Sequence, residues 1–316
     1  MDKNLFFLNG RSALRAGLML LKIKKYEEVM LPQFICDSVL HPFKDLKIKV
    51  TYYEIDKSFS PNWKDIEKKY NKKTKAIMMV HYFGYPSEIK KFLNFKKKKK
   101  IFLIEDYCHG YGGKENKYRL GSLGDFSFSS LKKIFPETIS GGILKINNDS
   151  LNNISFLNNI KRKKTSSLIF NFKKKIIDFK HNIKNKYSEN QKYADYAASS
   201  FAKKTKFLLG DINSYNFLIK KNLFLERKKR FNEFNRIKKI FKSKNVNPLF
   251  NLKNRSLLPW YFVGKIDKKN RKNIFVWASL KGLKVFSWPK FPNQVEKIKL
   301  NKSNWENIIC VKLDDR

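Results

Sequence analysis

Short apolar runs alternate with amphipathic stretches along the first half of the chain. The apolar runs have the length of strands, and the stretches between them have helical periodicity. The predicted strands cover residues 28–32, 48–55, 76–81, 101–104 and 126–129. The predicted helices cover residues 11–22, 35–43 and 61–70. This alternation predicts an α/β fold, with a mainly parallel sheet and helices on both of its faces.

The pattern changes after about residue 150. Residues 152–204 are rich in Lys, Asn and Ser and give little strand signal. A basic stretch at 217–244 predicts one long helix, and a compact α+β unit is expected to follow it. We therefore expect a large α/β domain over residues 1–215 and a small C-terminal α+β domain over residues 216–316.

Two of the predicted strands end in side chains of complementary chemistry. One leads into Asp106, and the next leads through Ser130 into Lys132 and Lys133. Ligands of parallel sheets bind outside the carboxyl ends of the strands, so these groups should share one crevice. A carboxylate and an amine together suit pyridoxal phosphate chemistry. The amine holds the aldehyde as a Schiff base, and the carboxylate keeps the pyridine nitrogen protonated.

Composition narrows the class of protein. The chain has 316 residues, of which 42% are hydrophobic and 28 are Phe, enough for a large core. The net charge of +42 would attract anions, but the lysines are spread along the chain among many Asn, Ile and Phe residues. We interpret the charge mainly as compositional drift on solvated faces. A charge-driven nucleic-acid binder is the alternative, although no nucleic-acid motif supports it, and we expect no nucleic-acid partner.

Cysteine usage and hydropathy bear on location. The three cysteines, Cys36, Cys108 and Cys310, have no paired spacing, which argues against a disulfide framework and a metal site. No window approaches the roughly 18 apolar residues of a membrane span. The apolar run at the start of the chain is too short for a signal peptide. These features predict a cytoplasmic protein without a membrane span.

Six segments carry recognisable motifs, in one order and at sensible spacing. They are Asn9-Gly-Arg-Ser-Ala-Leu14, Glu28-Val-Met-Leu-Pro32, the segment 74–84, Ile104-Glu-Asp-Tyr-Cys-His-Gly110, Gly121-Ser-Leu-Gly-Asp125 and, more weakly, Gly282-Leu-Lys-Val285 with Ser287-Trp-Pro289. In these segments the chain resembles the DegT/StrS-type family of pyridoxal phosphate-dependent sugar aminotransferases, within the aspartate aminotransferase fold group. The resemblance implies a seven-stranded-type sheet of the fold type I architecture.

The resemblance assigns roles to residues near the cofactor ring. Asp106 matches the residue that pairs with the pyridine nitrogen, and His109 matches the position that donates to the ring oxygen. The family's ring-stacking aromatic residue would fall near Cys36, and Phe34 is its nearest substitute.

The phosphate would lie at the start of the first helix. Gly10, Arg11 and Ser12 open that helix, and backbone N–H groups at such a position bind phosphate. Arg11 stands where the family has a small hydroxyl residue.

Two alignments compete for the cofactor lysine. Counting from Gly124-Asp125 selects Lys133, with Ser130 as a phosphate hydroxyl. Counting from Phe126-Ser-Phe128 selects Lys132 with Ser127. We favour Lys133, because Ile134-Phe-Pro136 then also matches the family pattern.

The implied activity is transfer of an amino group, from glutamate, to a keto-sugar that is nucleotide-linked, in surface polysaccharide or lipopolysaccharide synthesis. The resemblance also implies a homodimer. Only nine residues precede Gly10, where the family has several tens, and residues 151–215 show no match to it. The alternative is therefore a shortened paralogue that acts as a cofactor-binding or partner subunit.

Overall fold

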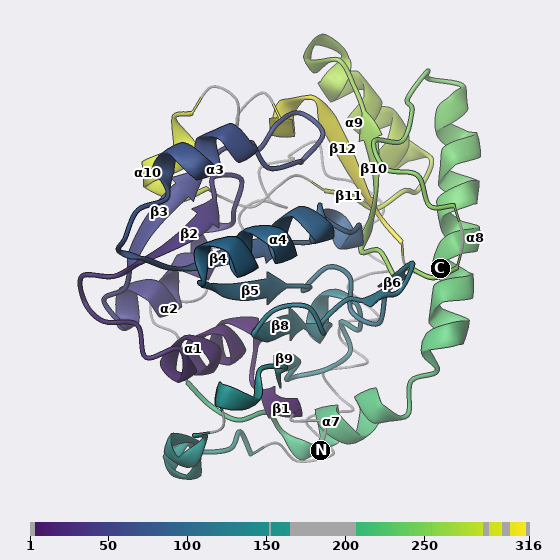
Figure 1. Ribbon diagram of the computed structural model, residues 1–316. Coiled ribbons are helices and arrows are strands. Elements are labelled where there is room, and N and C mark those ends of the chain that lie inside the picture. Colours follow the sequence, from purple (N-terminus) through teal and green to yellow (C-terminus); the bar gives the residue numbers. More distant parts are fainter. Residues whose placement is uncertain are drawn as a thin grey trace.

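A central sheet of seven strands dominates the computed structural model, which describes residues 4–151, 153–164, 207–253, 255–286, 291–298 and 304–313 (Figure 1). The strand order is β1-β9-β8-β5-β4-β2-β3. The strands are β1 (Asn4–Phe7), β2 (Glu28–Pro32), β3 (Lys49–Tyr53), β4 (Thr74–Val80), β5 (Phe102–Asp106), β8 (Phe126–Ser130) and β9 (Gly142–Ile146). Strands β3, β2, β4, β5 and β8 run parallel, and β9 is antiparallel to both β8 and β1. The predicted α/β fold with a mainly parallel sheet is confirmed.

The helices of the first half connect the strands. They are α1 (Gly10–Leu20), α2 (Leu40–Asp45), α3 (Trp63–Lys69) and α4 (Ile89–Lys99), with short 3₁₀ turns η1 (Asp37–Val39), η2 (Tyr82–Gly84), η3 (Leu131–Lys133), η4 (Asp149–Leu151) and η5 (Ser155–Asn159). In Figure 1, α4 lies in front of the sheet and α2 behind it. Side-chain oxygens of Asn9 and Asn62 accept backbone N–H groups at the starts of α1 and α3. Helix α1 packs on β8 through Gly17, where an added Cβ would lie 2.3 Å from the Phe126 ring.

The second half of the chain forms a smaller sheet with its own helices. Strands β10 (Tyr261–Lys265), β12 (Ile308–Lys312) and β11 (Val285–Phe286) pair in that order. A separate hairpin in the first half of the chain consists of β6 (Lys114–Glu115) and β7 (Tyr118–Arg119). The helices are α7 (Ile212–Ile219), α8 (Leu223–Lys242), α9 (Arg271–Leu280) and α10 (Asn293–Glu296), with the turn η6 (Lys268–Asn270). Helix α8 runs along one side of the molecule (Figure 1).

The single long helix predicted at 217–244 is wrong. The structure has two helices there, because the Asn222 side chain accepts the N–H groups of Phe224 and Leu225 and so starts α8 anew. Helix α7 begins before the predicted span, at Ile212, and is capped by Asp211. Strand β1 was not predicted. The polar segment 165–206 and the weak motif at 287–289 lie outside the described residues.

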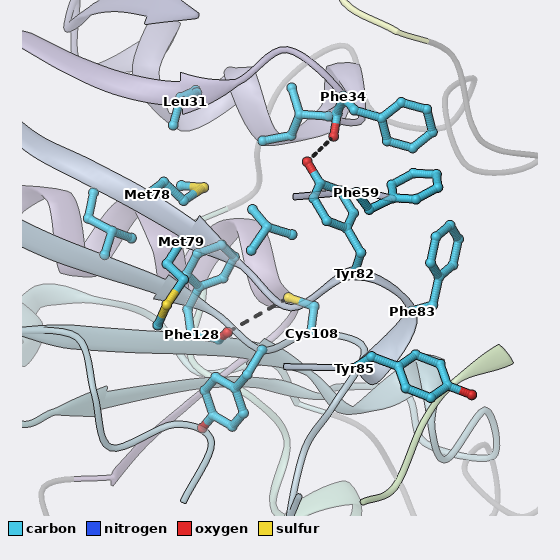
Figure 2. Packing of buried hydrophobic residues seen from close by; sticks show 14 of the residues in the cluster. Leu31, Phe34, Phe59, Met78, Met79, Tyr82, Phe83, Tyr85, Cys108 and Phe128 are labelled. Atoms are coloured by element: carbon cyan, nitrogen blue, oxygen red, sulfur yellow. Dashed lines mark hydrogen bonds between the residues drawn. The ribbon is translucent and has the colours of Figure 1, made fainter. Parts of the chain in front are cut away.

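The core of the main sheet is built from buried strands and aromatic side chains. Met30, Ile77, Met78 and Leu103 are fully buried, as expected for strands covered on both faces. Figure 2 shows the aromatic side chains that close one end of this core: Phe34, Phe59, Tyr82, Phe83 and Tyr85. In the described parts of the chain, no helix is long and apolar enough to cross a bilayer.

A buried carboxylate fastens β5 to the loop that leads into β8. Glu105 accepts hydrogen bonds from the backbone N–H groups of Gly121, Leu123 and Gly124 and from the Ser127 hydroxyl, at 2.6 to 3.1 Å. His81 Nε2 lies 3.1 Å from Oε1 of the same carboxylate. Burial would raise the pKa of Glu105, but the His81 contact and these hydrogen bonds bring it below the ordinary value. The ionised carboxylate therefore stabilises the registration of β5 and β8.

Replacing Glu105 with Gln should cost about 1–3 kcal/mol of folding free energy, because an amide cannot accept all of the buried donors. Since the pKa of Glu105 is lowered on folding, its contribution is present above the unfolded pKa of about 4.3 and is lost as the pH falls through the folded value. Urea unfolding at a series of pH values should show a smaller acid-induced loss of stability in Glu105→Gln than in the wild type. Glu296→Gln, at an exposed carboxylate on α10, is the control. Equal pH dependence in Glu105→Gln and wild type would contradict this account.

Candidate active site

The site forms where β5 and β8 end side by side. Strand β5 ends at Asp106, which pairs in register with Phe128 of β8, and the chain then enters η3 with Lys133 at its end. Asp106 is buried, and its Oδ1 accepts the Cys108 N–H at 2.9 Å. Burial raises the pKa of Asp106, and the charge of nearby Lys133 opposes this rise. The two groups that the sequence analysis paired therefore lie close enough to interact electrostatically.

The two candidate lysines have different surroundings. Lys133 Nζ lies 2.8 Å from His109 Nε2 and 4.9 Å from the centroid of the Trp260 ring. Lys132 Nζ instead donates to the Ile139 carbonyl oxygen at 2.8 Å. The lysine that shares a site with Asp106 is thus Lys133.

The serines differ in the same way. Ser127 is fully buried and its hydroxyl donates to Glu105, so it belongs to the strand-fastening network. Ser130 is half-buried at the end of β8. A Cβ added to Gly10 would lie 3.1 Å from Ser130 Cβ, so the first residue of α1 packs directly beside this serine. The structure brings Ser130 and Gly10 together, as the Lys133 alignment requires.

The N-terminal end of α1 lies at the same edge of the sheet. The Ser12 N–H donates to the Asn9 side chain. Of the three residues expected to bind phosphate, Ser12 therefore already uses its backbone N–H in the helix cap. Burial lowers the pKa of Arg11, and the nearby Cys36 thiol opposes this effect. The positive end of the helix dipole and a half-buried guanidinium thus stand together.

His109 is held on both ring nitrogens. Its Nδ1 accepts the Phe83 N–H at 3.1 Å, while its Nε2 faces Lys133. Burial lowers the pKa of His109 well below its ordinary value, and the Lys133 charge adds to this. The imidazole is therefore neutral at physiological pH.

Phe34 lies in the aromatic cluster of Figure 2. Its ring packs against Phe59, Phe291 and Tyr82, with centroid distances of 4.8, 5.0 and 5.8 Å. Its carbonyl oxygen accepts the Tyr82 hydroxyl at 2.7 Å. These contacts are with the core; a stacking role of Phe34 on a cofactor stays a prediction.

Trp260, from the second half of the chain, also lies in the site but was not predicted. Trp260 directly precedes β10, and its backbone N–H donates to the Phe83 carbonyl oxygen at 2.8 Å. The centroid of its ring lies 4.6 Å from that of the His109 ring. Among the described residues, its Nε1 is one of the buried polar atoms without a hydrogen-bond partner. No motif or spacing marks this residue. Only its place in the expected C-terminal α+β unit could have drawn attention to it.

The residues present fit pyridoxal phosphate. A buried carboxylate suits a protonated ring nitrogen, Lys133 supplies the amine, and the start of α1 offers N–H groups for a phosphate. The unpaired indole N–H of Trp260 leaves a donor in the same site. Within the described ranges, no group of three or more His, Cys, Asp or Glu side chains could hold a metal ion.

Solved structures with similar folds include proteins named as aminotransferases. A putative sugar aminotransferase from Streptococcus pneumoniae, in its PLP form, aligns with a TM-score of 0.67 at 13% identity, covering 99% of this chain and 82% of that one. Helicobacter pylori PseC, an aminotransferase involved in the biosynthesis of pseudoaminic acid, aligns with a TM-score of 0.66 at 14% identity, covering 98% and 81%. At these identities the likeness shows the fold alone.

Sequence comparison gives the family. GDP-perosamine synthase of Escherichia coli O157:H7 is 31% identical over 147 residues, which is 45% of this chain and 40% of that protein. GDP-4-keto-6-deoxy-D-mannose 3-dehydratase of Yersinia pseudotuberculosis is 27% identical over 135 residues, 42% and 34% of the two chains. The matched region thus spans less than half the length of these relatives. The DegT/DnrJ/EryC1/StrS aminotransferase family model matches residues 4–185. The chain belongs to the DegT/DnrJ/EryC1/StrS aminotransferase family.

Proposed function

We propose that the protein is a pyridoxal phosphate-dependent aminotransferase that moves an amino group from glutamate to a nucleotide-linked keto-sugar. One observation carries the proposal: Lys133 Nζ lies 2.8 Å from His109 Nε2 and interacts electrostatically with buried Asp106. This arrangement joins an amine, a neutral imidazole and a carboxyl group at the carboxyl ends of adjacent parallel strands. Family membership supports the same conclusion.

Each residue has a physical task in this proposal. When bound, the cofactor supplies an electron sink for the carbon that loses a proton. Asp106 holds a proton on the ring nitrogen, and its burial strengthens that interaction. Lys133 would hold the cofactor through its amine, and its free amine would move the substrate proton as a general base. His109 orients the ring by donating from Nε2, while Gly10 at the start of α1 helps to bind the phosphate.

The substrate class rests mainly on the relatives. The net charge of +42, although mainly compositional drift, would suit a substrate that bears phosphate groups. Two sequence relatives are named for reactions of GDP-linked sugars, and PseC is named as an aminotransferase in the biosynthesis of pseudoaminic acid. We extend this class to the present chain, and with it a role in surface polysaccharide or lipopolysaccharide synthesis in the cytoplasm. A homodimer is part of the same proposal.

A division into two domains also belongs to the proposal. The predicted boundary at 215/216 falls inside α7, so we place the junction in the turn between α7 and α8, at Lys220 and Lys221. The separate three-stranded sheet of β10, β11 and β12 supports a distinct C-terminal unit.

Lys133→Ala should abolish covalent attachment of pyridoxal phosphate, because the Lys133 amine lies beside His109 whereas the Lys132 amine donates to the Ile139 carbonyl oxygen. Purified protein would be incubated with the cofactor, reduced with borohydride and analysed by peptide mass spectrometry. The wild type should carry the adduct on Lys133. Lys132→Ala is the matched control and should retain the adduct. An adduct on Lys132, or no adduct in the wild type, would refute the assignment.

Asp106→Asn should preserve cofactor attachment but slow the reaction with glutamate by roughly 100-fold, because the neutral amide cannot hold the ring-nitrogen proton electrostatically. Stopped-flow absorbance after glutamate addition measures this half-reaction. Asp149→Asn, an exposed surface change, should react like the wild type. An undiminished rate in Asp106→Asn would contradict the proposed role.

A panel of nucleotide-linked keto-sugars separates the proposal from its alternative. With the amino form of the loaded protein, an active enzyme should convert at least one member to an amino-sugar, detected by mass spectrometry. Covalent cofactor on Lys133 with no conversion of any member would favour a cofactor-binding or partner subunit instead.

A further inference from the structure

Phe83 has an unusual backbone for a bulky, fully buried residue. Its φ is 56° and its ψ is 4°, in the left-handed region that large L-residues avoid. Gly84 follows with φ +100°, and a Cβ there would lie 2.3 Å from the His109 carbonyl oxygen. The turn η2 is therefore pressed against the backbone of His109. Such a conformation persists only where the surroundings hold it in place.

The left-handed turn aims both backbone polar groups of Phe83 at the site. Its backbone N–H donates to His109 Nδ1 at 3.1 Å, and its carbonyl oxygen accepts the backbone N–H of Trp260 at 2.8 Å. One residue thus links the histidine from the main sheet to the tryptophan from the second half of the chain. The sequence analysis gave Phe83 no role.

We propose that Phe83 is a positioning residue, whose backbone N–H holds His109 as the neutral tautomer with its proton on Nε2, directed at Lys133. The inference rests on the proposed function for its use, but not for its geometry. A nitrogen that accepts a hydrogen bond carries no proton, so a neutral ring must carry its proton on the other nitrogen. Burial disfavours the imidazolium, the state in which both ring nitrogens carry a proton, and so leaves the neutral ring.

This tautomer determines what His109 can do. An Nε2–H group donates, so it fits a lone pair on Lys133 or an oxygen of a bound ring, and it repels a lysine that still carries its extra proton. Among the described residues, the groups that interact with Lys133 besides His109 include the Asp106 carboxyl, the Cys108 thiol and the Trp260 ring. Burial raises the pKa of Cys108, so its thiol stays neutral. The Nε2–H of His109 is thus a donor directed at the Lys133 nitrogen.

His81 provides an internal reference. The Ser87 N–H donates to His81 Nδ1 at 3.0 Å, and His81 Nε2 faces Glu105 at 3.1 Å. The same reasoning assigns the proton of His81 to Nε2. The chain contains only four histidines, so individual signals can be resolved.

The tautomer can be read from long-range ¹H–¹⁵N correlation spectra of the full chain labelled with ¹⁵N-histidine, without added cofactor. The His109 signal is identified by its loss in His109→Gln. We expect an unprotonated Nδ1 and a protonated Nε2, unchanged between about pH 5 and 8, the range in which an ordinary histidine titrates. A proton on Nδ1, or an imidazolium at neutral pH, would overturn the inference.

Phe83→Gly and Phe83→Ala form a matched pair that separates positioning from packing. Both lose the aromatic ring, but only Gly adopts positive φ without strain. Positioning predicts that Gly keeps the His109 tautomer, whereas Ala gives a mixture of tautomers. If packing alone mattered, Ala would be equal or better, and that result would overturn the inference. Unchanged His81 signals verify that each variant is folded.

These spectra test the role of Phe83 separately from the proposed function. A wrong tautomer with a cofactor adduct on Lys133 would refute only the role of Phe83. The expected tautomer without any adduct would refute the proposed enzyme and leave the positioning intact.

Discussion

Parallel pairing of β5 with β8 brings Asp106 and Lys133 to one edge of the sheet, and every other feature of the site is arranged around that edge. The pairing covers only three residues of each strand. Glu105 compensates by gathering the loop before β8 onto β5, with His81 behind it. Glu105 thus stabilises the fold beside the site, whereas the neighbouring Asp106 accepts the Cys108 N–H and lies in the field of Lys133.

Much of this could be read from the sequence. Apolar runs of strand length located the parallel strands, and the rule that ligands bind at the carboxyl ends of strands paired Asp106 with a lysine. The choice between Lys132 and Lys133 could not be made from spacing alone. Adjacent residues in η3 point in different directions, and only their contacts show that one donates to Ile139 while the other faces His109.

Other features depend on tertiary contacts that no local pattern encodes. The break between α7 and α8 comes from one Asn222 cap inside an otherwise helical sequence. The positive φ of Phe83 is held by contacts with His109 and Trp260, residues 26 and 177 positions away along the chain. Local propensity would assign neither Phe83 to a left-handed turn nor Trp260 to the site. The second half of the chain therefore completes a site whose motifs all lie in the first half.

The central claim is that Lys133 and Asp106 together hold pyridoxal phosphate. A crystal structure of the protein with the cofactor tests it most directly. The account predicts continuous density from Lys133 Nζ to the cofactor, with Asp106 within about 3.2 Å of the ring nitrogen. Density that joins the cofactor to another lysine, or a ring nitrogen remote from Asp106, would contradict it.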